Sequence, residues 1–241
     1  PSLAHDPNAT RIFDFSRSGI AAFAAKASIA GYSREVCTWY YVFAELCLVC
    51  ASGAFAGLSR DIKDGQIAYT LGRPCNLLAY NWAQRLGVGI SQAPLFLGVG
   101  WIIASLAAGP WLPDSPLRLA ALLLAFILSV SIQFFIQSAL AMIAFWFEEN
   151  AAFLWLFSKL TLVAGTLTPL EFLPDAWQEP LRWTPFPWIA WAPARLAVVP
   201  DLDLATAASL LGGQVAWLAA AVLIATLVFR LGIRQTTVQG G

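Results

Sequence analysis

Charged residues are scarce in this chain. Asp, Glu, Lys and Arg make up only 12% of it, about half of the ~25% usual in soluble domains, whereas 59% of the residues are hydrophobic. The 14 acidic and 14 basic residues balance, so the sequence has neither the basic excess of a nucleic-acid binder nor a charged tail. This composition excludes an ordinary soluble domain and favours a membrane protein with no nucleic-acid partner.

Residues that commonly build catalytic or metal sites are also rare. His5 is the single histidine, which argues against a histidine-based metal site or catalytic triad. The sequence contains no H-E-x-x-H, no G-x-S-x-G and no G-x-x-x-x-G-K-[ST] phosphate loop. Cys47 and Cys50 have the spacing of a redox motif but lie in an apolar segment, so we expect buried small side chains rather than a disulfide. The sequence therefore predicts no catalytic residue, no metal site and no cofactor bound by this chain.

Several apolar segments approach or exceed the roughly 20 residues that a membrane-spanning helix needs. Five are expected to span the bilayer: 36–57, 86–108, 117–147, 151–170 and 205–229. The predicted fold is an all-α polytopic membrane protein in which residues 1–241 form a single transmembrane domain.

The N-terminal residues 1–31 are less apolar than the predicted spans. Asp14, Arg17 and Lys26 fall in their most apolar part, and three charges in one span are unfavourable. We therefore expect a polar segment with an interfacial or partial helix rather than a full span. The chain begins with Pro1 rather than Met, which leaves room for upstream sequence, and no signal peptide is expected.

A polar interruption, residues 59–74, separates the first two predicted spans. Ile62 and Ile67, with Tyr69 and Leu71, give it an apolar side. Its charged side and its ending are supplied by Arg60, Asp61, Lys63, Asp64, Gly65, Arg73 and Pro74. Glycine permits a tight turn, and proline cannot continue a helix. This pattern predicts an amphipathic helix that docks a soluble partner; the alternative is a solvated loop.

Lys and Arg residues also indicate which side of the membrane each loop faces. They gather between the first two spans and after the last span, which places both regions in the cytoplasm. Residues 171–204 then face outward. This outer segment is too rich in proline for a spanning helix, so short re-entrant or interfacial helices are expected. Its aromatic residues are expected at the membrane interface: Trp177, Trp183, Phe186, Trp188 and Trp191.

Four of the polar residues inside the predicted spans are candidates for a pathway or for contacts between helices. Glu45 and Lys159 both map near the bilayer midplane, where we expect either a cross-helix ion pair or exposure to a water-filled cavity. Gln133 and Gln137, four residues apart, form a stripe suited to hydrogen bonding between helices. Glu148 and Glu149 precede a predicted helix and are expected to favour its N-terminus.

Two motifs resemble the type-2 class of ATP-binding-cassette (ABC) exporter permeases, in its bacterial branch. The first is D-I-K-D-G-Q-I-A-Y-T-L-G-R-P at 61–74, preceded by G-Y-S-R-E-V at 31–36. The second runs from T-P-L-E-F-L-P-D at 168–175 through P-F-P-W at 185–188 to A-P-A-R-L at 192–196. The resemblance covers about residues 31–230 and departs from the family before residue 31, where a first span is due.

The resemblance implies a permease subunit of the bacterial inner membrane with six spans. Two protomers, identical or sister chains, would face each other, and separate cytosolic ATPase subunits would bind ATP and Mg²⁺. Residues 59–74 would be the coupling helix and 171–204 a re-entrant cap.

The predicted function is export through a dimeric pathway. The alternatives are an intramembrane lipid-modifying enzyme and a non-transporting membrane scaffold. The sequence does not identify a substrate, although the apolar spans favour a lipidic or amphipathic cargo.

Overall fold

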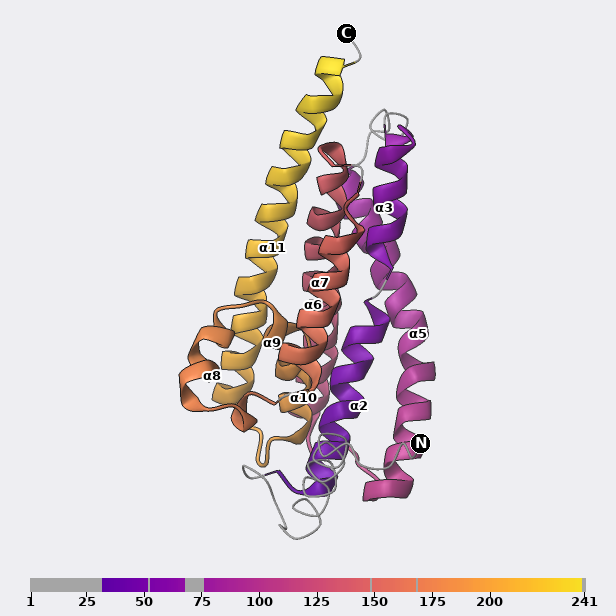
Figure 1. Cartoon of the computed structure of the whole chain (residues 1–241). Helices are drawn as coiled ribbons and strands as arrows, with labels where there is room; N and C mark the ends of the chain where they lie inside the picture. The colour runs from indigo at the N-terminus through magenta and orange to yellow at the C-terminus, as the bar shows by residue number, and fades with distance from the viewer. Residues whose placement is uncertain (1–31, 52, 68–75, 148, 168, 240–241) are drawn as a thin grey trace, which may run out of the picture.

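The computed structural model describes residues 32–51, 53–67, 76–147, 149–167 and 169–239, and every regular element in these ranges is a helix (Figure 1). Two elements come first: α2 (Arg34–Cys50) and α3 (Ala54–Lys63). The long helices α5 (Leu77–Ala108) and α6 (Pro116–Met142) follow, and η1 (Ile143–Phe145) extends α6. After α7 (Ala151–Thr161) and η2 (Leu162–Leu167) come four short helices: η3 (Leu170–Phe172), α8 (Asp175–Arg182), α9 (Phe186–Ile189) and α10 (Trp191–Val198). Helix α11 (Leu204–Gln239) ends the described chain.

Four of these helical stretches are long and apolar enough to cross a membrane. They are 34–63, 77–108, 116–145 and 204–234. The fifth predicted span, 151–170, corresponds instead to a shorter apolar helix, Ala151–Leu167. At about 1.5 Å per residue this stretch is roughly 25 Å long, short of the ~30 Å hydrocarbon core. The structure therefore shows four full-length spans and does not show the fifth that the sequence predicted.

The ends of the long helices follow local sequence signals. The side chains of Ser33, Asn76 and Ser115 each accept a hydrogen bond from a backbone N–H in the first turn of α2, α5 and α6. Helix α5 starts nine residues before the predicted Leu86, because Asn81, Gln84 and Arg85 interrupt the apolar run in the sequence without ending the helix. It ends at Ala108, as predicted, where Gly109 has a φ of 82°. Helix α11 continues past the predicted stop at Arg230.

The predicted boundary between the first span and the docking segment also lies elsewhere. We expected it near Gly57, but α2 ends at Cys50 and α3 starts at Ala54. Gly53 caps α3 with a φ of 103°, a conformation that glycine adopts without strain. The apolar residues after Gly53 therefore belong to α3, so α3 carries an apolar first half and a charged end on one helix.

Small residues allow the helices to pack closely. Ala121 and Ala125 on α6, Ala192 and Ala194 on α10, and Ala207 on α11 are buried in one cluster with α2. A second cluster joins α3, the start of α5, the end of α6 and the later part of α11. Figure 1 shows α8, α9 and α10 gathered beside the first half of α11, far from α3. The bundle thus has an α3 end and an α10 end.

Candidate functional site

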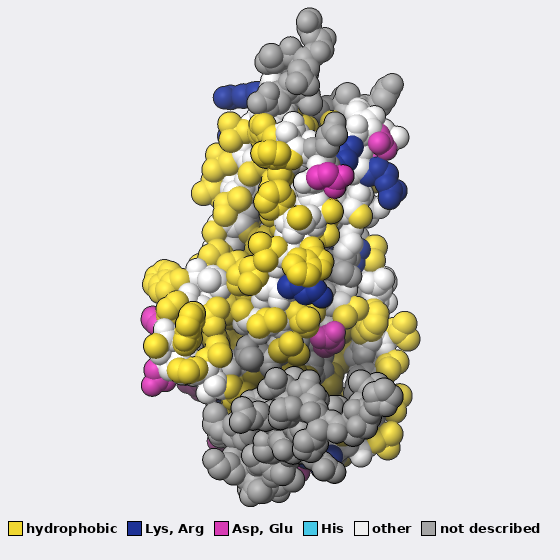
Figure 2. Space-filling view, viewed as in Figure 1, with side chains coloured by type: hydrophobic (Ala, Val, Ile, Leu, Met, Phe, Trp, Pro, Cys, Tyr) yellow, Lys and Arg dark blue, Asp and Glu magenta, His cyan; other side chains and the backbone are white. Residues whose placement is uncertain are grey.

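The charged docking residues lie at the tip of α3. Arg60, Asp61 and Lys63 are exposed on its last two turns, and exposed Asp64 is its C-cap. Gly65 has a φ of 71° and makes the tight turn that the sequence predicted. The other predicted docking residues, Arg73 and Pro74, lie outside the described residues, as do Tyr69 and Leu71. Figure 2 shows charges of both signs near this end of the molecule.

The opposite side of α3 is apolar and packed. Phe55, Leu58 and Ile62 are buried, as is Ile67 after the turn. These side chains contact α6 and η1 within one hydrophobic cluster. The segment is therefore amphipathic, as predicted, and its free face is the charged one.

A buried polar contact links α3 to the start of α7. The Ser59 hydroxyl donates to the Asn150 side-chain carbonyl at 3.0 Å. The Asn150 amide nitrogen donates in turn to the backbone carbonyl of Ala141 at 3.0 Å, close to the end of α6. Neither residue was singled out from the sequence, because a polar pair 91 positions apart leaves no local signal. Asn150 thus joins α3 to the end of α6. Of the two preceding acidic residues, Glu149 is exposed and Glu148 lies outside the described residues.

Glu45 and Lys159 do not form the ion pair that was one of the two alternatives. Both side chains are exposed, and within the described ranges neither has a partner of opposite charge within 4.0 Å. The Lys159 ammonium instead lies 5.9 Å from the centre of the Trp155 ring. Figure 2 shows one basic and one acidic group in the middle of this face, which is otherwise mostly hydrophobic.

Glu45 lines a cavity instead. Its volume is about 320 Å³, it is bounded by α2, α5 and η2, and most of its wall is apolar, including Tyr41 and Phe96. Thr166 also lines it and carries a buried hydroxyl with no hydrogen-bond partner among the described residues. The surroundings of Glu45 thus agree better with the cavity alternative than with a pair.

The predicted glutamine stripe on α6 is buried. Gln133 and Gln137 are 4% and 3% exposed, and in the described structure their side-chain carbonyls have no hydrogen-bond partner. Gln214 on α11 makes bonds between helices that the sequence did not predict. Its amide nitrogen donates to the carbonyls of Ala125 at 3.2 Å and Trp188 at 2.9 Å. Ser129 on α6 donates to the next carbonyl of α9, that of Ile189.

At the α10 end, an ion pair holds three segments together. The Arg195 guanidinium lies 3.3 Å from the Glu171 carboxylate and donates to the Tyr32 hydroxyl at 2.8 Å. Tyr32 and Trp191 each donate to Glu171 at 3.1 Å. Burial, reinforced by the Glu171 charge, raises the pKa of Tyr32, so its hydroxyl keeps the proton that it donates.

The interfacial position predicted for Trp191 is therefore wrong, because Trp191 is buried inside the bundle. Trp177 and Trp183 are exposed, as expected for interface residues, while Phe186 and Trp188 are half-buried.

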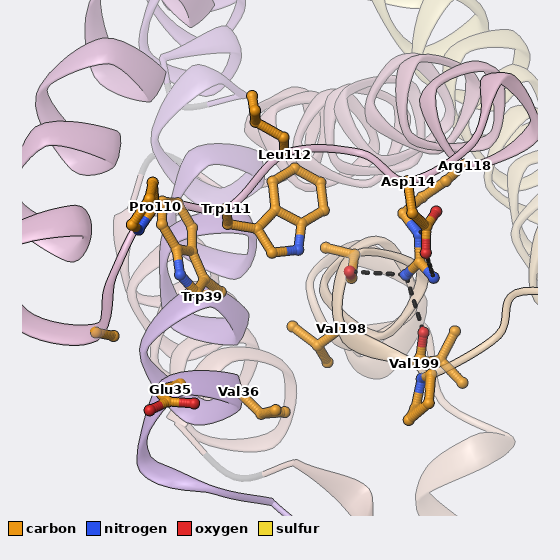
Figure 3. A pocket seen from close by; sticks show the side chains of 13 residues that line it. Glu35, Val36, Trp39, Pro110, Trp111, Leu112, Asp114, Arg118, Val198 and Val199 are labelled. Atoms are coloured by element: carbon orange, nitrogen blue, oxygen red, sulfur yellow. Dashed lines mark hydrogen bonds and ion pairs between the residues drawn. The ribbon is translucent and has the colours of Figure 1, made fainter.

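A cavity of about 330 Å³ lies beside this network (Figure 3). Trp39 and Trp111 line it on one side, and Glu35 lies apart from the Arg118–Asp114 pair. The Arg118 side chain is only 4% exposed, and its guanidinium is hydrogen-bonded. One of its nitrogens donates to the backbone carbonyls of Leu196, Ala197 and Val199. Because these are carbonyls at the end of α10, we assign Arg118 a structural role.

Nothing in the described ranges forms a metal centre: no group of three His, Cys, Asp or Glu side chains is arranged to hold an ion. Cys37, Cys47 and Cys50 are free and buried, as predicted for the last two. Cys75 lies outside the described residues.

The long apolar helices and the charged tip of α3 define a multi-pass helical membrane protein with one amphipathic end. A family model described as ABC-2 family transporter protein matches residues 18–240. The chain therefore belongs to the ABC-2 family of transporter membrane proteins. Searches of curated proteins and of solved structures gave no match.

Proposed function

We propose that this chain is the permease subunit of an ABC exporter in the bacterial inner membrane. Two protomers, identical or sister chains, form the pathway, and separate cytosolic ATPase subunits supply ATP and Mg²⁺ binding. Membership of the ABC-2 family is the observation that carries this proposal, since ABC permeases work with ATPase subunits. The charged, exposed tip of α3 supports it further, because its apolar side is already covered by α6 and η1.

In this proposal the α3 end is cytosolic, and Arg60, Asp61, Lys63, Asp64 and Gly65, with Arg73 and Pro74, form the docking surface. Movement of α3 would reach α6 and α7 through the Ser59–Asn150 contact. Glu45 and its cavity would belong to the substrate pathway. Lys159, Gln133 and Gln137 remain candidates for the same pathway.

The segment 171–204 is proposed to be the re-entrant cap on the outer side. The depth of α9 supports this: Ser129, which donates to α9, is 13 residues into α6 counting from Pro116. At 1.5 Å per residue that corresponds to about 20 Å along the helix. The carbonyls of Trp188 and Ile189 accept side-chain bonds there, as backbone inside a membrane must.

A charge-reversal variant of the docking surface tests the proposal. The variant combines Arg60→Glu, Lys63→Glu and Asp64→Lys, and the matched control combines Asp175→Lys and Arg182→Glu on α8. We expect the first to lose copurification of the ATPase subunit and its stimulation in proteoliposomes, while the control keeps both. If the α3 variant binds and stimulates the ATPase like wild type, the docking role is wrong.

Sidedness is tested separately by cysteine labelling on a cysteine-free background. A cysteine at Asp64 is expected to react only from the cytosolic side, and one at Gln178 only from the outside. The reverse pattern would invert the proposed topology.

A further inference from the structure

A cavity of about 260 Å³ lies between α3, α5 and α6, towards the α3 end. Its polar wall comes from all three helices: Asp61 on α3, Asn81, Gln84 and Arg85 on α5, and Ser138 on α6. None of these residues except Asp61 belongs to the proposed docking surface. The cavity is smaller than the 300–1,000 Å³ usual for drug-sized ligands, so it suits a small polar group.

Arg85 brings an uncompensated positive charge to this cavity. One nitrogen of its guanidinium donates to the carbonyl of Cys50 at 3.2 Å, at the break between α2 and α3. A second nitrogen lies so close to Gly53 that a Cβ there would be 3.3 Å from it. The third, Nε, is buried without a hydrogen-bond partner among the described residues, and no described carboxylate lies within 4.0 Å of the guanidinium. Since arginine offers five N–H donors, most of its capacity is left for a ligand.

Ser138 supplies a second, independent sign of a missing ligand. Its side chain is fully buried in α6, and its hydroxyl has no partner in the described structure. Serine in a helix commonly bonds to the carbonyl four residues before it, and Ser131 does so at 2.6 Å. A buried polar group without a partner is unfavourable, so the Ser138 hydroxyl and the Arg85 Nε call for an acceptor in the cavity that both line.

The surroundings of the cavity indicate where such an acceptor comes from. Leu58, Val88 and Phe134 complete its wall, and Val88 and Ile90 are exposed on α5. Only 6% of the most apolar stretch of α5 is buried within the bundle, so most of this stretch is open to whatever surrounds the chain. Arginine matches the geometry of a phosphate group, and basic pockets between membrane helices bind lipid headgroups.

Asp61 adds a negative charge to the other side of the same cavity. We propose that this cavity binds the headgroup of a zwitterionic aminophospholipid. Arg85 and Ser138 hold the phosphate, and Asp61 holds the primary ammonium group. One basic and one acidic residue match the two charges of phosphoethanolamine, whereas the negative charge of Asp61 disfavours an anionic headgroup such as phosphoglycerol. This site does not depend on transport.

Lipid binding to the purified full chain tests the proposal. Delipidated protein in detergent is titrated with phosphatidylethanolamine or phosphatidylglycerol, and bound lipid is counted by native mass spectrometry. We expect wild type to retain phosphatidylethanolamine preferentially. Arg85→Gln should weaken its binding about tenfold or more, because a charge-assisted hydrogen bond is lost. Arg60→Gln removes the same charge from a residue that does not line the cavity and should bind like wild type.

Asp61→Asn is the decisive variant, because Asp61 is exposed and is not the residue that bonds to the helix break, which is Arg85. We expect it to reverse the preference towards phosphatidylglycerol, while Asp64→Asn, its matched control, leaves the preference unchanged. Ser138→Ala should weaken both lipids equally without changing the preference.

Water-soluble ligands separate a lipid headgroup from a free phosphate. If inorganic phosphate stabilises the chain against heat as much as phosphatidylethanolamine does, the ligand is free phosphate and the proposal is overturned. It is also overturned if wild type shows no headgroup preference, or if Asp61→Asn keeps the wild-type preference; the cavity then holds water only.

Discussion

Ser59 and Asn150 form a buried hydrogen bond of 3.0 Å that joins the charged half of α3 to the first turn of α7. Ser59 is 4% exposed and Asn150 is fully buried, so water cannot take the place of either partner in this hydrogen bond. Ser59→Ala would leave the Asn150 carbonyl unpaired, and we expect a loss of roughly 1–3 kcal/mol in the free energy of unfolding. Asn150→Ala should cost more, because it also removes the bond to Ala141.

A double-mutant cycle in detergent measures how much of this loss belongs to the pair. The combined Ser59→Ala and Asn150→Ala variant should be more stable than the sum of the two losses implies. Additive losses would mean that the two side chains act separately.

Arg118 is expected to be the most sensitive cation at the α10 end. Arg118→Met leaves three backbone carbonyls of α10 without their donor, and we expect a loss of at least about 2 kcal/mol in the free energy of unfolding. Arg118→Lys should lose less stability than Arg118→Met but remain below wild type, because lysine keeps the charge but offers fewer fixed donors. Arg182→Met, at an exposed position on α8, is the control and should change stability by less than about 0.5 kcal/mol. Equal melting temperatures for the two methionine variants would refute the capping role.

The ion pair between Arg118 and Asp114 predicts that stability depends on pH. The hydrogen bond from Arg118, 2.7 Å long, lowers the pKa of Asp114. A lowered carboxylate pKa adds stability above the pKa of the unfolded chain, and this stability is lost as the pH falls through the lower, folded value. Wild type should therefore lose part of its thermal stability on acidification, and Asp114→Asn should lose less over the same interval. Parallel curves for the two proteins would contradict this.

Gly165 is expected to tolerate no side chain. A Cβ at this position would lie 2.6 Å from the backbone carbonyl oxygen of Phe186, and a backbone atom cannot move aside alone. Gly165→Ala should therefore destabilise the chain by about 1–3 kcal/mol. Gly98→Ala on α5 is the matched control, because nothing lies within 4 Å of the added atom. It should be neutral or stabilising by up to about 1 kcal/mol, since alanine favours a helix. Thermal unfolding distinguishes the two; a stable Gly165→Ala would mean that η2 and α9 are not in contact.

Glu45 and Lys159 are expected to act independently. They form no ion pair within 4.0 Å and both are exposed, so the losses from Glu45→Gln and Lys159→Met should add within about 0.5 kcal/mol. Only Glu45 lines the cavity between α2, α5 and η2, so Glu45→Gln should change substrate-stimulated ATPase activity of the assembled transporter more than Lys159→Met does. A coupling well above 1 kcal/mol would restore the ion-pair hypothesis.

Hydropathy predicted the membrane class and most helices, because an apolar run of sufficient length leaves few other solutions. It failed where helix geometry changes inside an apolar run. The break between Cys50 and Ala54 is hidden in a continuous hydrophobic stretch. Helix α7 ends at Thr161, where η2 continues the chain with π-helical geometry and packs against α9. It also missed the first turns of α5, whose polar residues resemble a loop.

The site residues divide in a similar way. The charges of α3 and the turn at Gly65 are local features, and the sequence predicted them. Gln214, Asn150 and Arg118 act through partners 89, 91 and up to 81 positions away, so only the folded chain reveals their contacts. The stripe of Gln133 and Gln137 was a correct reading of a polar helix face, but the carbonyl groups of the glutamines found no partner.

The two consecutive carbonyls of α9 that bind Gln214 and Ser129 have a mechanical consequence. Each carbonyl is tied to a different long helix, so a tilt of α6 against α11 would stretch one of the two bonds. We therefore expect these three helices to move together as one block. Any change of angle is expected instead at the break between α2 and α3, where α3 could tilt without bending α2.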